Sequence, residues 1–381
     1  MIFQKEVGEA LTLKFAQTAA EMKAQGREII SLGLGEPDFK TPEYIVQAAF
    51  DAINKGYTHY SAVQGLQELR ELIANDLNNS YGSDYSPAEV IITPGIKAAA
   101  YFSLAAILQP QDEVILISPY YVSYPAMIKL AEPDSKIIRV PLEKNFTLDI
   151  EKIKAAFSDR TKAIVINFPN NPTGMFINDA EMSEIANLAI KHNAYIISDE
   201  VYSKLIYGGG KCASLAQHKD AKDYAIICNG YSKSHAMTGW RLGYAVAPSS
   251  VIKKMNKLQQ HINTNTCTFV QKSACAIYSH EAVHLKAYLE ELEKRMSYFC
   301  SSVNSFGKMS AVCPKAGFFC FADISSYGQD SNTFCSLLLK KTGIASTPGI
   351  AFGPEWDSYV RFSLAVPMST VERAVKLLKD Y

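Results

Sequence analysis

Short, continuously apolar segments recur through the middle of this chain, and longer helical patterns separate them. The segments rich in β-branched and aliphatic residues are 90–93, 113–117, 162–167, 195–198, 225–228 and 242–246. Because their apolar residues do not alternate with polar ones, each segment is typical of a strand buried on both faces. Helical patterns lie between them at 97–108, 122–130 and 179–192. This order predicts an α/β fold with a mainly parallel, doubly wound sheet.

The C-terminal part carries a different pattern. A long amphipathic helical pattern over about 281–306 is followed by β-like segments at 317–322 and 359–364 and by a closing helix at 370–381. This order predicts a smaller α+β domain. The chain of 381 residues is long enough for two domains. We expect a large domain over 40–285 and a small, discontinuous one formed by 1–39 and 286–381.

Charge and cysteine usage exclude several classes of protein. The chain has 38 basic and 38 acidic residues, so no overall charge attracts it to nucleic acid or to an anionic membrane. No segment approaches the ~20 apolar residues of a membrane span, and Met1–Glu9 has no signal-peptide core. The eight cysteines include no Cys-x-x-Cys pair. We therefore expect a cytoplasmic protein with reduced cysteines and without a metal site.

Polar or small residues follow the ends of five of the predicted strands. They are Gly95–Lys97, Tyr120–Tyr121, Asn170–Gly174, Asp199 with Tyr202, and Lys233. Ligands of open α/β sheets bind beyond the carboxyl ends of the strands. The sequence thus predicts one binding site at this edge of the sheet.

Three of the charged residues near this edge suit one cofactor. Lys233 follows a predicted buried strand, and burial and the neighbouring Arg241 lower the pKa of such an amine. Asp199 ends another strand and can face a pyridinium nitrogen, although a carboxylate there can also cap the next helix. A Schiff-base lysine, an aspartate and an arginine beside a phosphate are what pyridoxal phosphate requires.

Further residues complete this hypothesis. Asn171 and Tyr202 can donate to the phenolic oxygen of the cofactor, while Asn171 also lies in an ordinary turn signal. Gly95 precedes a predicted helix, whose free amides suit a phosphate. Arg361 lies among apolar residues and needs a partner, either a substrate carboxylate or an internal ion pair.

From Gly33 to Arg361, the chain resembles the class I/II aminotransferases among the fold-type I pyridoxal-phosphate enzymes. The segment Lys233–Gly243 matches the family's cofactor-attachment pattern, and Asn170–Gly174 and Asp199–Tyr202 match in order and spacing. The resemblance implies a large domain with a mainly parallel seven-stranded sheet, a smaller α+β domain and a homodimer.

The resemblance also implies a role for each site residue. Lys233 would carry the cofactor as an aldimine and move the proton at the substrate Cα, and Tyr121 would stack on the ring. Tyr60 would reach the partner subunit's cofactor phosphate. The phosphate site would comprise Gly95, Ile96, Lys97, Ser232 and Arg241. The substrate α-carboxylate would be held by Gly35, Asn171 and Arg361.

The pattern within the family is closest to bacterial aspartate aminotransferases, through Gly35–Phe39 and Ser118–Pro125. In that subgroup a lysine at the position of Lys97 can recognise an acidic side chain, and Thr12 is a second candidate. A solvated Lys97 at a helix start is the alternative, although the helix dipole disfavours a cation there. Ile96 departs from the glycine that is common at its position.

These implications lead to one main function and two alternatives. The main hypothesis is an aminotransferase that moves the amino group of aspartate or glutamate to a 2-oxo acid such as 2-oxoglutarate by a ping-pong mechanism. An apolar pocket formed by Tyr120, Tyr121 and Phe352 would instead favour aromatic or other amino acids. A carbon–sulfur β-lyase on the same scaffold is the second alternative. A DNA-binding regulator lacks support, because no basic helix-turn-helix pattern is present.

Overall fold

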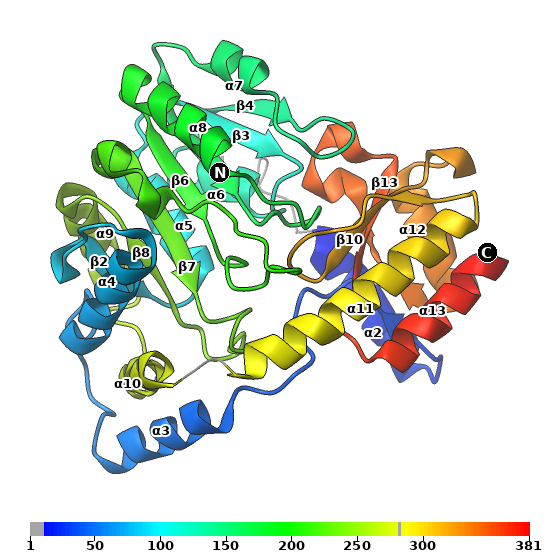
Figure 1. Ribbon diagram of the computed structural model, residues 1–381, viewed down its shortest axis with the longest axis horizontal. Coiled ribbons are helices and arrows are strands. Elements are labelled where there is room, and N and C mark those ends of the chain that lie inside the picture. Colours follow the sequence, from blue (N-terminus) through cyan, green and yellow to red (C-terminus); the bar gives the residue numbers. More distant parts are fainter. Residues whose placement is uncertain (1–10, 281–282) are drawn as a thin grey trace.

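The computed structural model of the protein describes residues 11–280 and 283–381. The centre of this part is a seven-stranded sheet with the order β2-β8-β7-β6-β5-β3-β4 (Figure 1). Its strands are β2 (Val90–Thr93), β3 (Glu113–Ser118), β4 (Lys136–Pro141), β5 (Thr161–Asn167), β6 (Tyr195–Asp199), β7 (Ala225–Gly230) and β8 (Gly243–Val246). Strand β8 is antiparallel to both of its neighbours, β2 and β7, and the other neighbouring strands are parallel to each other. The predicted α/β fold with a mainly parallel sheet is confirmed.

The continuously apolar segments are explained by helices on both faces of the sheet. In β6, Ile196 packs into one helical layer and the next residue, Ile197, into the other. Strand β4 was not expected from the sequence. It lies at the edge of the sheet, where Lys136 and Arg139 remain exposed, so its apolar pattern is interrupted.

Two sets of helices cover the sheet. One face packs against α5 (Ile96–Ile107), α6 (Tyr124–Ala131) and α9 (Ser249–Ile262). The other packs against α3 (Glu43–Asn54), α4 (Gln67–Tyr81), α7 (Ile150–Ala156), α8 (Asp179–His192) and α10 (Thr268–Ala274). Helix α8 begins where the sequence predicts because the Asn178 side chain accepts from the Glu181 amide at 3.0 Å.

A second core lies beside the large sheet (Figure 1). It contains the antiparallel sheet β12-β13-β10-β9 and the parallel pair β1-β11. These strands are β1 (Ile30–Ser31), β9 (Ser310–Ala311), β10 (Phe319–Asp323), β11 (Ile344–Ala345), β12 (Thr347–Pro348) and β13 (Tyr359–Ser363). The associated helices are α2 (Leu11–Ala24), α11 (Val283–Ser305), α12 (Ser331–Thr342) and α13 (Met368–Asp380). The smaller α+β part expected from the sequence is therefore present.

Helix α11 connects the two parts. Near its start, His284 Nε2 donates to the carbonyl oxygen of Ser234 at 3.1 Å. Farther along, Arg295 Nη1 donates to Asp38 Oδ2 at 2.8 Å. The predicted boundary between residues 285 and 286 falls inside this helix, and the exact limits of the two domains, 40–285 against 1–39 with 286–381, stay a prediction.

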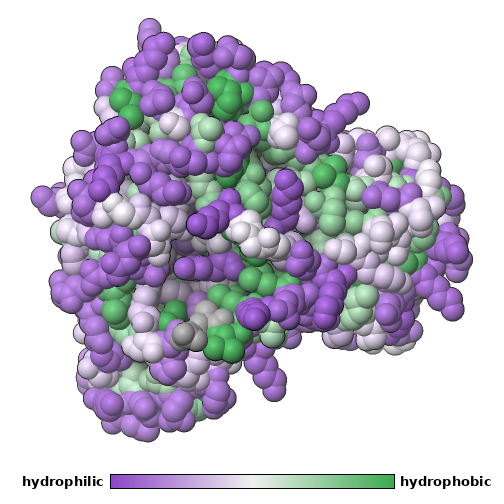
Figure 2. Space-filling model, in the orientation of Figure 1, coloured by the Kyte–Doolittle hydropathy of each residue, from purple (hydrophilic) through white to green (hydrophobic). Residues whose placement is uncertain are grey.

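On the face shown in Figure 2, polar residues predominate, and hydrophobic residues show in smaller patches, several of them near the middle of the molecule. Within residues 11–280 and 283–381, no helix is both long enough and apolar enough to cross a membrane.

Candidate active site

A cavity of about 410 Å³ lies beyond the carboxyl ends of the parallel strands. It reaches the antiparallel sheet β12-β13-β10-β9, the small sheet of the second part. It is lined by residues from both parts of the chain. Among them are most of the residues predicted for the site: Gly35, Ile96, Lys97, Tyr121, Asn171, Asp199, Tyr202, Ser232, Lys233, Arg241 and Arg361. Residues far apart in sequence thus meet at the edge of the sheet where a ligand was expected.

Lys233 lies in the turn that follows β7. Its Nζ donates to the carbonyl oxygen of Gly35 at 2.7 Å and lies 6.0 Å from the centre of the Phe318 ring. Burial is the main cause that lowers the pKa of Lys233 to about 8, and the positive charge of Arg361 lowers it further. Most of this amine is still protonated at pH 7, but its neutral, nucleophilic fraction is far larger than that of an ordinary lysine.

Asp199 ends β6 and is buried. Its Oδ2 accepts a hydrogen bond from the Tyr124 hydroxyl at 2.5 Å, and its Oδ1 accepts from the Val201 amide at 3.1 Å. Burial raises the pKa of Asp199 to about 6, against the lowering effect of these hydrogen bonds and of Lys233. Because a cation on the cavity side would stabilise the carboxylate, the site is suited to a protonated ring nitrogen.

Tyr124 is a candidate site residue that the sequence pattern did not single out, and it lines the cavity. It lies on α6, and its ring also contacts that of Tyr121 edge-on, with centroids 5.6 Å apart. Tyr124 lies within Ser118–Pro125, a segment that resembles bacterial aspartate aminotransferases. The signal available was a tyrosine one helical turn after the predicted stacking residue, Tyr121.

Asn171 and Tyr202 line the same cavity as Lys233. The Asn171 side-chain oxygen accepts from Arg361 Nη1 at 2.9 Å. This bond leaves the Nδ2 group of Asn171 as the donor toward a ligand. The Tyr202 ring is buried and packs edge-on against Phe318 and Phe319, with centroids 5.7 and 5.9 Å away.

The start of α5 and Arg241 form a cradle for an anion. Gly95 has a φ of +88°, and a Cβ there would lie 2.5 Å from Arg241 Nη2. A Cβ on Gly243 would lie 2.4 Å from the amide nitrogen of Ile96. Glycine at position 95 therefore lets the Arg241 side chain approach the start of α5. Glycine at position 243 lets strand β8 approach the same helix start. Free amides at a helix start beside a guanidinium group suit a phosphate dianion.

Arg361 lies on β13 and reaches the cavity from the small sheet. Its Nη2 donates to the Gly33 carbonyl oxygen at 2.7 Å, and its guanidinium carbon lies 4.2 Å from the Phe319 ring centre. Its buried Nε has no hydrogen-bond partner. Within the described residues no carboxylate forms an ion pair with Arg361. A substrate carboxylate would supply the missing negative charge.

These features fit pyridoxal phosphate. The cradle at α5 would hold the phosphate, and Asp199 would pair with the ring nitrogen. The Lys233 amine would react with the aldehyde, while Asn171 and Tyr202 would donate to the phenolic oxygen. An unpartnered arginine donor in the same cavity leaves a place for an amino-acid carboxylate.

Three of the predicted site residues lie elsewhere. Gly95 does not line the cavity but sets the start of α5. The Tyr60 side chain is 85% exposed and does not line the cavity of its own chain. Thr12 lies in α2, and its side chain is outside the described part of the structure.

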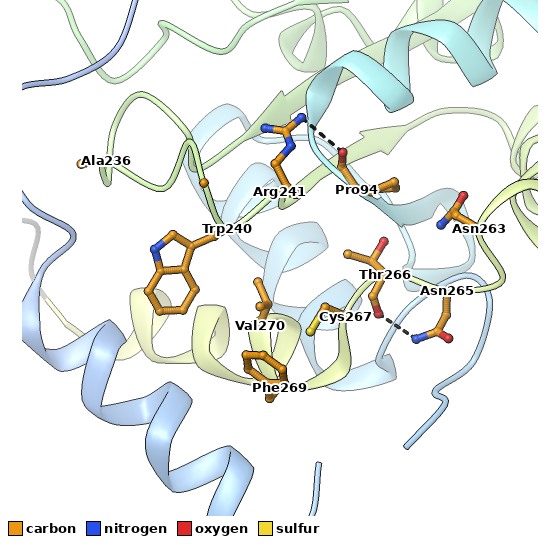
Figure 3. Close-up of a pocket in the computed structure, with 11 residues that line it drawn as sticks. Pro94, Ala236, Trp240, Arg241, Asn263, Asn265, Thr266, Cys267, Phe269 and Val270 are labelled. Carbon is orange, nitrogen blue, oxygen red and sulfur yellow. Dashed lines mark hydrogen bonds between the residues drawn. The ribbon is translucent and has the colours of Figure 1, made fainter. Parts of the chain in front are cut away.

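A second cavity of about 620 Å³ shares Arg241 with the site (Figure 3). Figure 3 shows apolar side chains, Trp240, Phe269 and Val270, along one part of it, and the amides of Asn263 and Asn265 along another. It is more open than the first cavity and brings neither Lys233 nor Asp199 to its wall. Of the two cavities, only the first is lined by both of these residues.

Comparison with known proteins gives a consistent result. Residues 27–378 match the model of the family described as aminotransferase class I and II. The aspartate aminotransferase of Bacillus subtilis is 37% identical over 97% of this chain and 95% of its own length. An aromatic-amino-acid aminotransferase of Thermococcus litoralis is 38% identical over 94% of each chain. The aspartate aminotransferase of Thermus thermophilus, solved with maleate, superposes with a TM-score of 0.94 at 33% identity, over 100% of this chain and 98% of its own.

The pKa of Lys233 predicts how the rate of cofactor attachment depends on pH. Because the neutral amine attacks the aldehyde, attachment to the apoenzyme should accelerate as the pH rises through about 8 and level off above it. The appearance of visible absorbance after mixing with pyridoxal phosphate measures this rate. Lys233→Ala should give no such absorbance at any pH, whereas the exposed Lys211→Ala should behave as the unmodified protein. A rate independent of pH would contradict the assignment.

Tyr124→Phe tests the hydrogen bond to Asp199. Without the hydroxyl, the pKa of Asp199 should rise further and its support of a protonated ring nitrogen should weaken, so kcat should fall about 10- to 100-fold. The phenyl ring keeps its packing, so the variant should fold, with Tm lowered by no more than a few degrees for the lost hydrogen bond. Tyr120→Phe is the matched control, since its hydroxyl does not contact Asp199. Equal activity of the two variants would remove Tyr124 from the site.

Proposed function

This chain belongs to the class I and II aminotransferases, and we propose on that premise that its amino donor is a dicarboxylic L-amino acid, aspartate or glutamate. It is a pyridoxal-phosphate-dependent amino-acid aminotransferase. The acceptor would be a 2-oxo acid such as 2-oxoglutarate, which uses the same cavity in the second half of a ping-pong reaction. The alternatives, other amino donors and carbon–sulfur β-elimination, are not favoured, because relatives named aspartate aminotransferase match nearly the whole chain.

The observation that supports a dicarboxylic substrate is a second cation in the cavity. Lys97 lines it together with Arg361, and its Nζ lies 5.5 Å from the centre of the Tyr121 ring. No carboxylate within the described residues pairs with Lys97. Arg361 can hold the α-carboxylate while Lys97 meets the side-chain carboxylate, so two anionic groups find two separate cations.

Pyridoxal phosphate, when bound, supplies an aldehyde that takes up an amine and a ring that accepts the electrons of the Cα–H bond. The chain's own residues do the rest. In the first half-reaction Lys233 acts as the general base that removes the proton from the substrate Cα. In the second half-reaction it acts as the general acid that delivers a proton to the Cα of the new amino acid. Asp199 keeps a proton on the ring nitrogen, and Arg361 fixes the carboxylate, which orients the Cα–H bond. Tyr121 covers the site and excludes water.

A panel of half-reactions tests the donor. Aspartate and glutamate should convert the cofactor to its amine form with the highest kcat/KM. Lys97→Met should lower that value by about 10- to 100-fold for aspartate and change it little for alanine, because only the charge-assisted contact is lost. Conversion by aromatic donors alone would contradict the proposal, and pyruvate release from a cysteine-like substrate without an acceptor would favour the β-lyase.

A homodimer with shared sites fits the surface of the chain. Tyr60 is 85% exposed, and exposed apolar side chains lie on α3 (Phe50 and Ile53) and α9 (Ile262). The second cavity, which shares Arg241 with the active site, offers a place for a partner's tyrosine (Figure 3). The partner's Tyr60 would then reach the phosphate of this subunit. Burial of such apolar groups is the usual source of dimer stability.

Mixing two damaged variants tests this arrangement. Lys233→Ala and Tyr60→Ala should each be impaired, but a mixture should regain activity after subunit exchange. The reason is that one of the two sites in each mixed dimer then contains both original residues, Lys233 and the partner's Tyr60. If Tyr60 served its own subunit, no mixed site would be intact, and the activity of the mixture would stay at the average of the two. A mixture of Lys233→Ala with Lys211→Ala sets the baseline for exchange.

A further inference from the structure

Three cysteine thiols meet in the small domain, away from the active-site cavity. Cys300 on α11 and Cys320 on β10 have their sulfur atoms 3.8 Å apart. Cys313 lies in the loop between β9 and β10, and its thiol also forms a hydrogen bond with Cys300. Cys300 is therefore the central member of the cluster, with a possible partner on either side. All three are free thiols.

One member of the cluster can be reached from solvent. Cys313 is exposed, whereas Cys300 and Cys320 are 3% and 0% exposed. Cys313 also lines a surface cavity of about 240 Å³ together with Tyr207, Met296 and Lys315. This volume admits a molecule the size of a hydroperoxide. The exposed sulfur, the half-enclosed cavity and the buried second thiol form the arrangement of an attacking thiol with a resolving thiol behind it.

We propose that Cys313, Cys300 and Cys320 form a thiol-oxidation site, which a hydroperoxide enters through the cavity at Cys313 and which stores a disulfide on Cys300. The site is separate from the aminotransferase chemistry. None of its three residues lines the active-site cavity.

The chemistry balances with hydrogen peroxide as the oxidant. The Cys313 sulfur attacks one peroxide oxygen, the O–O bond breaks, and the other oxygen leaves as water once it has gained a proton. The Cys300 sulfur then attacks the resulting sulfenic acid, and its hydroxyl leaves as a second water. Two thiols lose two electrons and two protons, and both peroxide oxygens are reduced to water.

Cys320 can move the disulfide inward. Its thiol lies in contact with Cys300 and can attack the Cys300 sulfur, which breaks the bond to Cys313 and returns a proton to the Cys313 thiol. For this bond to form, the distance between the Cys300 and Cys320 sulfur atoms must shorten by roughly 2 Å. After this exchange the disulfide joins α11 to β10 inside the core, and Cys313 is again free.

The electrostatics of the thiols set the character of the site. The hydrogen bond to Cys300 and partial burial raise the pKa of the Cys313 thiol above its usual range. The thiolate is therefore scarce near neutral pH, and oxidation should be slow and should accelerate as the pH rises. A stabilised thiolate would favour the reduced form of the pair. Since the Cys313 thiolate is not stabilised, the disulfide should resist reduction once it has formed.

Peptide mapping of the oxidised holoenzyme tests the proposal. The protein is treated with hydrogen peroxide at about pH 7 and about pH 9, its remaining thiols are alkylated, and it is digested without reduction. The expected result is a disulfide that joins Cys300 to Cys313 or to Cys320, formed faster at the higher pH. Since the bond closes a loop of about 20 residues or fewer, the oxidised protein should also have a Tm higher by at least about 2 °C.

Three variants make the result specific. Cys300→Ser should form no disulfide within the cluster, because both alternatives need that residue. Cys313→Ser should slow formation of the Cys300–Cys320 bond, because it removes the exposed thiol. Cys335→Ser is the matched control: Cys335 is buried in the same domain but lies outside the cluster, so the disulfide should form as in the unmodified protein. Alkylation of Cys300 after oxidation of the unmodified protein, or its pairing with any other cysteine, would overturn the proposal.

Discussion

The backbone of Gly33 and Gly35 holds together two cations that come from different parts of the molecule. The carbonyl oxygen of Gly33 accepts from Arg361 on the small sheet, and that of Gly35 accepts from Lys233 in the turn after β7, each at 2.7 Å. Gly33 and Gly35 both line the cavity, so their carbonyl oxygens serve the same site. The substrate-binding and the covalent functions of the site thus depend on one short segment.

Charge balance within the cavity follows from this arrangement. Arg361 lowers the pKa of Lys233, so a cation that binds the substrate carboxylate also favours the reactive amine. Asp199 is buried, and only two hydrogen bonds and the nearby lysine oppose the cost of its charge. A bound cationic ring would stabilise the carboxylate further. The cavity is therefore organised for a ligand that is positive at its ring nitrogen and negative at its phosphate and carboxylate.

The sequence predicted the ends of six of the seven strands of the large sheet well, because each of these six is a local run of apolar residues buried on both faces, whereas the partly exposed edge strand β4 is not. Lys233, Asp199 and Asn171 could be recognised in advance because each follows such a run. Tyr124 could not, since its partner Asp199 is 75 residues away and only tertiary packing of α6 on the sheet brings them together. The clustering of Cys300, Cys313 and Cys320 could not be predicted from the sequence for the same reason. Tyr60 remains a prediction because its expected contacts are in a second subunit.

We propose that the cofactor is attached to Lys233, and the rest of the site is organised around this residue. The most direct measurement is reduction of the holoenzyme with borohydride, followed by peptide mapping to find the lysine that carries the added cofactor mass. We expect this mass on the peptide containing Lys233, with one cofactor per chain. Its presence on Lys97, the other lysine that lines the cavity, would show that the assignment of Lys233 is wrong.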